Sequence, residues 1–385
     1  MKQRWEIKKL GDIVTFKSGY TPKDYELSGV GDVPYYKVSD MNHELNTKYL
    51  HHTSLFLKDG CKSFPKHSIV FPKNGAAIAT NKKRILTRES VVDLNTGIIC
   101  VSNPYTLNYE YLYLFIQNID FRLYTRRGAV PTLDSAELKS LPIPVPPIAE
   151  QKKIVAELDC LSGIIEKKKQ QLKELDNLAQ SIFYEMFGDP VENDKGWEQK
   201  TIGSFSKCVA GATPSTKVKE YWDGGTIPWL SSGEVGNGRI YATEKHITQE
   251  GYDNASTKLI PPHTVVMALA GQGKTRGTVG VAEIPLCTNQ SICSIITNDG
   301  VNVDFLYYQL RYLYHELRDI SNGDGGRGGL NLKLIQGFKV LVPPFDLQQE
   351  FASKIESIEK QKELIAQSIK ETETLFNSRM DYYFN

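Results

Sequence analysis

The sequence lacks the features of several protein classes. Its 6 cysteines include no C-x-x-C pair, and no histidine lies at metal-ligand spacing from one of them, so neither a zinc site nor a disulfide framework is expected. No apolar run reaches the roughly eighteen residues that a membrane span requires. The chain opens with MKQRWEIKKLGD rather than with an apolar leader. We therefore expect a soluble, cytoplasmic protein without membrane contact.

Sequence motifs for catalysis are also missing. SNPYT at 102–106 lacks the second proline of the Asn-Pro-Pro-Tyr signature of adenine methyltransferases. No G-x-G pattern between a strand and a helix offers a site for S-adenosylmethionine, and no histidine has the context of a catalytic triad. A nuclease-like arrangement of Asp120, Glu137 and Lys139 rests on too loose a pattern. We expect no catalytic residue and no metal or cofactor in this chain.

One stretch imitates a nucleotide-binding loop. ALAGQGKTRGTVG at 268–280 places Gly-Lys-Thr after an apolar run. The phosphate-binding loop of nucleotide hydrolases needs a helix directly after this lysine and threonine. The following RGTVGVAEIPL instead favours extended chain, because it contains glycines and β-branched residues. A nucleotide hydrolase that uses Lys274 remains an alternative function, and it would require a helix over 276–286.

Composition and charge fit a globular protein. The chain has 385 residues, of which 40% are hydrophobic and 24% charged, so two or three domains with sizeable cores are expected. Residues 1–147 carry 20 basic and 14 acidic side chains, whereas residues 148–190 carry 6 and 8. The total charge of +1 neither favours nor excludes nucleic acid, since basic residues can cluster on one face.

The chain contains an internal duplication, with a period of about 190 residues. WEIKKLGDIVTFKSGYTPK from Trp5 recurs as WEQKTIGSFSKCVAGATPS from Trp197, and YEYLYLFIQNI recurs as VDFLYYQLRYL. LNTG around Asn95 returns as TNQS around Asn289, and LPIPVPPIAEQKKI returns as FKVLVPPFDLQQEF. Each half is a globular part followed by a long helix. The expected segments are 1–147 (first globular part), 148–190 (first helix), 191–345 (second globular part) and 346–385 (second helix).

The two helical segments have coiled-coil periodicity. Their apolar residues step by four and three between Glu/Lys-rich flanks. The expected seam consists of Leu158, Leu161, Ile165, Leu172, Leu175, Ile182, Ile355, Ile358, Ile365 and Ile369. The second helix has to return toward the first globular part, so the pair should be antiparallel, about 60 Å long for forty residues. The expected fold class is α/β (α+β) heads, internally duplicated and joined by a long antiparallel two-helix coiled coil. Such a chain is a dumbbell with pseudo-two-fold symmetry.

Two similar heads on a rigid rod suit a long, nearly two-fold ligand such as double-stranded DNA. Arg and Lys suit guanine edges and phosphates, and Asn and Gln suit adenine. Loops of both heads carry these residue types, and the candidate DNA-binding residues are Lys73, Asn74, Lys82, Lys83, Arg84, Arg88, Arg126, Arg127, Gln272, Lys274, Thr275, Arg276 and Arg327. An assembly scaffold without DNA contact remains a further alternative.

The repeated joints, PPIAEQKKIVAELD and PPFDLQQEFASKIESIEK, with two divergent heads, resemble the specificity subunit of type I restriction–modification systems over essentially the whole chain. The glutamine of the second joint falls on Gln348 or Gln349. The resemblance implies a non-catalytic DNA reader in which each head, a target recognition domain, reads one half of a split, asymmetric site. The coiled coil would set the spacer. Two methyltransferase subunits would bring S-adenosylmethionine and adenine-N6 methylation, and restriction/motor subunits would bring ATP and Mg.

Overall fold

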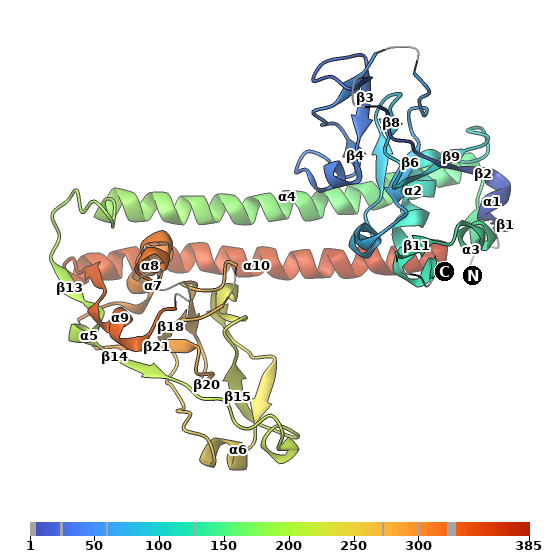
Figure 1. The fold of residues 1–385 in the computed structure, drawn as a ribbon. Coiled ribbons are helices and arrows are strands. Elements are labelled where there is room, and N and C mark those ends of the chain that lie inside the picture. The colour runs from blue at the N-terminus through green and yellow to red at the C-terminus, as the bar shows by residue number, and fades with distance from the viewer. Residues whose placement is uncertain are drawn as a thin grey trace. The chain divides into compact units, whose positions relative to one another are not determined.

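The computed structural model describes residues 5–23, 26–58, 61–126, 128, 130–271, 273–298, 300–321 and 329–385. The chain forms two compact units, Met1–Lys169 with Ser368–Asn385 (unit 1) and Gln170–Gln367 (unit 2). Two helices of 40 residues, α4 (Ile148–Phe187) and α10 (Phe345–Phe384), contribute to both units. Figure 1 shows the elements of each unit.

The two units have the same main sheet. In each, four strands are antiparallel neighbours and a fifth is added in parallel at one edge. In unit 1 the order is β2 (Val14–Ser18), β9 (Thr96–Val101), β6 (Ile69–Pro72), β7 (Arg84–Leu86) and β4 (Tyr49–Leu50). In unit 2 it is β14 (Ser206–Ala210), β21 (Ile292–Thr297), β18 (Thr264–Ala268), β19 (Val279–Ala282) and β16 (Arg239–Ile240). This shared order confirms the predicted duplication.

The central strands of each main sheet are buried on both faces. Ile69 and Phe71 of β6 belong to one apolar cluster, and Val70 between them belongs to another. In unit 2, Val265 and Val266 divide in the same way. Alternate residues of a strand point to opposite faces, so continuous β-branched and apolar runs are expected where both faces are covered.

Smaller elements are duplicated as well. Each unit has a three-stranded sheet: β5 (Phe56–Leu57), β3 (Val33–Tyr36) and β8 (Val91–Val92) in unit 1, and β17 (Lys245–Ile247), β15 (Ile227–Leu230) and β20 (Cys287–Thr288) in unit 2. Each has a two-stranded ribbon: β1 (Glu6–Lys9) with β12 (Pro142–Val145), and β13 (Gln199–Thr201) with β22 (Lys339–Leu341). The β10 (Thr125–Arg126) and β11 (Thr132–Leu133) hairpin has no counterpart among the described residues of unit 2. The short helices are α1 (Leu10–Ile13), α3 (Ser135–Ser140), α5 (Ile202–Phe205), α6 (Gln249–Asp253), α8 (Tyr314–Ile320) and α9 (Leu332–Gly337), with 3-10 turns at Val38–Asn42, Ala76–Thr80, Phe121–Tyr124, Lys219–Tyr221 and Val235–Asn237.

One buried helix fills the core of each unit. These are α2 (Tyr109–Asn118) and α7 (Val303–Tyr312), and their aromatic residues are in the core, as predicted. Each helix begins after an asparagine whose side chain accepts hydrogen bonds from the first free N–H groups, Asn108 for α2 and Asn302 for α7. Such a cap satisfies donors that have no partner within the helix.

A buried glutamine connects each core helix to the start of a long helix. The carboxamide of Gln151 accepts from the Asn108 N–H at 2.8 Å and donates to the Pro146 carbonyl at 2.8 Å. Gln348 makes the same two contacts in unit 2, at 2.9 Å to Asn302 and 2.8 Å to Pro343. Both side chains are fully buried. The repeated glutamine of the second joint is therefore Gln348 rather than Gln349.

The long helices pair antiparallel within each unit. In unit 1, Leu158 near the start of α4 shares a core with Met380 near the end of α10, and Arg379 pairs with Glu157. In unit 2, Phe183 near the end of α4 shares a core with Phe351 near the start of α10. Because the start of one helix meets the end of the other in both units, the predicted antiparallel arrangement is confirmed.

The expected seam residues lie on the inner or partly covered sides of the helices. Five are buried and five are half-buried; the buried ones are Leu158, Ile165, Ile355, Ile358 and Ile369, and the half-buried ones are Leu161, Leu172, Leu175, Ile182 and Ile365. Near the end of α4 the fully buried positions are Ala179, Phe183 and Phe187 instead of Ile182. The large Phe rings take these places because they fill the core of unit 2 as well as the helix pair.

The buried glutamine gives a stability prediction. Gln348→Leu leaves the Asn302 N–H and the Pro343 carbonyl without partners, so we expect a loss of about 1–3 kcal/mol in the free energy of unfolding. Chemical denaturation would measure it. Gln349→Leu, at an exposed position, is the matched control and should change stability by less than about 0.5 kcal/mol. A larger loss of stability for Gln349→Leu than for Gln348→Leu would contradict the assignment of Gln348 as the glutamine of the second joint.

Candidate nucleic-acid interface

The segment 269–278 joins β18 to β19 as a hairpin loop. The Ala268 N–H donates to the Thr278 carbonyl and the Gly277 N–H to the Ala268 carbonyl, each at 2.9 Å. Val279 then begins strand β19. The helix over 276–286 that a nucleotide-hydrolase site around Lys274 requires is absent. We reject that alternative, because the loop has no helix N-terminus to hold phosphates.

Several segments of unit 1 meet where β6 ends. The Lys73 N–H donates to the carbonyl of Asn95, just before β9, at 2.8 Å, and the Lys73 ammonium donates to the hydroxyl of Ser18, the last residue of β2, at 2.8 Å. The Leu133 N–H donates to the Lys73 carbonyl at 2.9 Å. We call this end of the main sheet the loop end of unit 1.

Three candidate DNA-binding residues of unit 1 lie together at this loop end. Asn74 bridges to Thr132 of the β10–β11 hairpin, and Arg126 pairs with the same Thr132 within the hairpin. The Arg126 guanidinium contacts both oxygens of Asp134 at 2.7 and 3.0 Å and lowers the pKa of that carboxyl to about 2. Burial lowers the pKa of Lys73. The fold thus places Lys73, Asn74 and Arg126 at one surface, although some fifty positions separate them in the sequence.

Unit 2 has an equivalent loop end. The Leu269 N–H donates to the Ser291 carbonyl at 2.8 Å, and the Leu330 N–H donates to the Leu269 carbonyl at 3.0 Å. These contacts repeat those of Lys73 with Asn95 and Leu133. The candidates Lys274, Thr275 and Arg276 belong to the hairpin loop here, with Lys274 exposed and the other two half-buried. The candidates Arg127, Gln272 and Arg327 lie outside the described residues.

Two candidates of unit 1 are structural instead. The Lys83 side chain is fully buried, and its ammonium donates to Asn81 and to the Ile119 carbonyl, both at 2.7 Å. Burial lowers the pKa of Lys83 to about 8. The Arg84 guanidinium donates to three backbone carbonyls, those of Asn46, Lys83 and Met41. The internal contacts of Lys83 and Arg84 argue against the predicted contact with DNA, because their charged groups bind groups of the chain itself.

Arg88 and Lys82 have different positions. Strands β6 and β7 are antiparallel, so the end of β7 lies beside the start of β6. Arg88 follows the end of β7, whereas Lys73 follows the end of β6 at the opposite end of the sheet. The structure therefore separates Arg88 from the loop end, and its guanidinium lies 5.9 Å from the centre of the Phe56 ring. Lys82 is half-buried, just before β7, and its ammonium donates to Asn42 at 2.5 Å.

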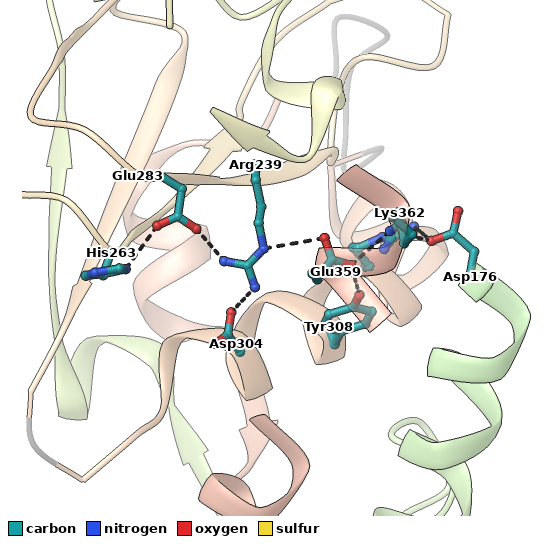
Figure 2. Close-up of polar contacts among 9 residues, drawn as sticks. Asp176, Arg239, His263, Glu283, Asp304, Tyr308, Glu359 and Lys362 are labelled. Atoms are coloured by element: carbon teal, nitrogen blue, oxygen red, sulfur yellow. Dashed lines mark hydrogen bonds and ion pairs between the residues drawn. The ribbon is translucent and has the colours of Figure 1, made fainter. Parts of the chain in front are cut away.

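An ion network lies at the other end of β19 in unit 2 (Figure 2). Arg239 of β16 is contacted by Glu283, Asp304 and Glu359, which come from the residue after β19, from α7 and from α10. Burial disfavours the charge of Arg239, but Asp304 and Glu283 outweigh it and the pKa is raised.

The network continues along the helices. Lys362 contacts Glu359 at 2.9 Å and Asp176 of α4 at 3.0 Å, and Tyr308 donates to Glu359 at 2.5 Å, as Figure 2 shows. It joins the sheet to α7, α10 and α4, so we assign it to the stability of unit 2. Unit 1 has a smaller counterpart, in which Tyr49 of β4 donates to Glu110 of α2 at 2.7 Å.

The repeated loop ends can be compared with known proteins. A model of the family described as "Type I restriction modification DNA specificity domain" matches residues 2–177 and 194–374. The chain belongs to this DNA specificity family.

Members of the DNA specificity family resemble the chain over most of its length. It is 23% identical over 295 residues to the type I restriction enzyme EcoR124I/EcoR124II specificity subunit of Escherichia coli, covering 74% of this chain and 71% of that protein. It is 22% identical over 446 residues to the HindI specificity subunit of Haemophilus influenzae, covering 92% and 93%. The crystal structure of the S subunit from M. genitalium has the same fold, with a TM-score of 0.61 at 15% identity and coverage of 99% and 96%.

Other features of this specificity-family chain concern membranes and metals. No described helix is both long and apolar enough to cross a membrane. Within the described ranges, no group of three or more His, Cys, Asp or Glu side chains is arranged to hold a metal ion.

Sequence reasoning missed several polar residues at the loop ends. They are Ser18 and Asn95 in unit 1, and Thr213, which donates to Gln290 at 2.5 Å, in unit 2. The repeat had matched Asn95 with Asn289. Backbone hydrogen bonds show that Asp93 is the equivalent of Asn289. The Asp93 carbonyl accepts from the N–H of Thr96, and the Asn289 carbonyl accepts from the N–H of Ile292. The signal that could have found these residues is the turn that precedes β9 and β21.

The buried ammonium of Lys83 gives a pH prediction. Its pKa is about 8 in the folded protein and roughly 10.4 in an unfolded chain, so between these values the unfolded state binds more protons. Stability from this group therefore rises with pH across that window. We would measure the free energy of unfolding of wild type and Lys83→Met from pH 7 to 10.5. Above pH 8 the free energy of unfolding of the wild type should rise relative to that of the variant. A difference that is constant with pH would contradict the lowered pKa.

Proposed function

We propose that this chain is the DNA-reading subunit of a type I restriction–modification complex, and that each unit reads one half of a split, asymmetric site in double-stranded DNA. The loop end of each main sheet is the reading surface. The observation that carries the proposal is the equivalent loop end in both units, built from the same backbone contacts but bearing different side chains. A scaffold without DNA contact does not explain why the repeated frame carries different polar groups there.

The chemistry of the two loop ends suits base reading. Unit 1 offers Lys73, Asn74 and Arg126, and unit 2 offers Lys274 with Thr275 and Arg276. Arg and Lys donate to guanine edges and phosphates, and Asn pairs with adenine. Sequence is read by groups that reach base edges, whereas phosphate contacts position the protein. The differing side chains therefore support different half-sites for the two units.

The proposed complex supplies the chemistry that this chain lacks. We assign S-adenosylmethionine and adenine-N6 methylation to two methyltransferase subunits, and ATP, Mg and DNA cleavage to restriction/motor subunits. The long helices set the spacer between the half-sites, and the whole complex works in the cytoplasm. These assignments rest on membership of the DNA specificity family.

Methylation mapping at single-base resolution tests the proposal. Cells that express the methyltransferase partner with this chain should show a split motif with adenine methylated in both halves. Replacing residues 1–140 by the same region of a relative with another specificity should change one half alone, because only unit 1 is altered. The control is the partner without this chain, where the motif should be absent. Methylation that is indifferent to the chain or to the exchange supports the scaffold alternative instead.

Lengthening both helices tests the spacer role. One heptad inserted after Lys169 in α4 and one after Gln367 in α10 lengthen each helix by roughly 10 Å. At ~3.4 Å per base pair this matches about three base pairs. Methylation mapping should show both half-motifs retained and the unread spacer longer by about that number, with a rotation between the halves. Insertion into α4 alone is the control and should lower stability, since the helices lose their register. An unchanged spacer with both insertions would refute the spacer role.

A further inference from the structure

The hairpin loop of unit 2 is held from one side by α8. Tyr314 Oη donates to the Lys274 carbonyl at 2.9 Å, and Arg318 Nη1 donates to the Gly273 and Arg276 carbonyls at 2.8 and 3.2 Å. Three of the four consecutive carbonyls from Gly273 to Arg276 therefore face α8. We call this arrangement the α8 clamp.

The two clamp residues also support each other. Arg318 Nη1 lies 3.0 Å from Tyr314 Oη, and its guanidinium lies 5.5 Å from the centre of the Tyr314 ring. A tyrosine hydroxyl that accepts one hydrogen bond and donates another is part of a cooperative chain. The planar, rigid guanidinium fixes the directions of its donors in a way that a lysine ammonium does not.

The loop backbone is shaped for this contact. Gly273 has φ +69° and Gly277 has φ +87°, both in the left-handed region that glycine adopts without strain. A Cβ at Gly277 would lie 3.4 Å from Arg318 Cγ and 3.6 Å from the Tyr314 ring, so the chain passes close against the clamp. With its carbonyl turned toward α8, Lys274 has an exposed side chain.

The clamp is anchored in the core of unit 2. Leu313, directly before α8, and Leu317 within it are buried in the main cluster. The equivalent loop of unit 1 is held differently, by the buried Lys83 with Asn81. The clamp is thus a property of one unit, and its function can be measured against the other unit within the same molecule.

We propose that Arg318 and Tyr314 are positioning residues that direct Lys274, Thr275 and Arg276 toward DNA and so determine base discrimination in the half-site of unit 2. This rests on the proposed function. The clamp groups act through the loop backbone and need not touch DNA, because their donors already bind loop carbonyls. A displacement of about 1 Å in a positioned group is enough to lose a directional contact.

The test uses the full chain assembled with its methyltransferase partner. The probes are duplexes that carry the mapped motif, and duplexes with one base pair changed in either half. For Arg318→Gln we expect binding discrimination in the half-site of unit 2 to fall about tenfold, which corresponds to ~1.4 kcal/mol. Discrimination in the other half should be unchanged. Tyr314→Phe keeps the ring and loses one donor, so a fall of about threefold is expected.

Two measurements separate positioning from direct DNA contact or simple loss of charge. Loss of a phosphate contact lowers the slope of log affinity against log salt by about one, whereas the clamp predicts an unchanged slope for Arg318→Gln. Arg318→Lys keeps the charge without the planar fork, so it should also lose discrimination. Full discrimination in Arg318→Lys, or a reduced salt slope in Arg318→Gln, overturns the proposal.

Matched variants control for folding and for net charge. Lys360→Gln removes an exposed positive charge of unit 2 that forms an ion pair with Glu356 of the same helix, and it should leave discrimination unchanged. If Arg318→Gln unfolds unit 2, base discrimination by Tyr314→Phe tests the clamp instead, because this variant keeps the aromatic ring in place. If exchange of units alters the half-sites but both clamp variants discriminate like wild type, the clamp proposal fails and the proposed function stands. If exchange has no effect, the proposed function itself fails.

Discussion

The arrangement of each unit depends on one buried carboxamide. Gln151 and Gln348 link the carbonyl of a proline before a long helix to the N–H of the residue that caps the core helix. The carboxamides themselves are fully buried, and a buried polar group without a partner is costly. The same side chain thus fixes where a long helix starts and how the core helix meets it. The sheets and ribbons pack around that junction.

The loop ends combine buried anchors with exposed positions. Central strands such as β6, β18 and β19 are buried along their whole length, and this frame recurs in both units. Ile78 in unit 1 and Leu269 in unit 2 anchor the connections in the core, and each unit holds the rest of its connection in a different way. Unit 1 uses Lys83, Asn81 and Arg84 around the loop between β6 and β7, whereas unit 2 uses Tyr314 and Arg318. A constant frame with separately supported loops is what a subunit with changing DNA specificity requires.

Basic residues in such loops serve two purposes that look alike in a sequence. Lys83 and Arg84 turn their charged groups to backbone carbonyls inside the fold, where burial lowers the pKa of each. Arg126 and Lys274 have exposed side chains. The basic run at 82–84 suggests a single surface, but the structure buries Lys83 completely and leaves Lys82 and Arg84 half-buried. Local composition contains no information about that direction.

The sequence by itself determined the duplication, the two long antiparallel helices, the core helices and the family. Each of these depends on periodicity or on repeated apolar and proline positions, which are properties of the chain. Only the tertiary structure decided which polar groups meet: the Lys73 ammonium with Ser18, Arg239 with three carboxylates, and Arg318 with the loop of Lys274. These contacts join residues that are tens to more than a hundred positions apart. Their partners are chosen by how the sheets and helices pack, which no local pattern records.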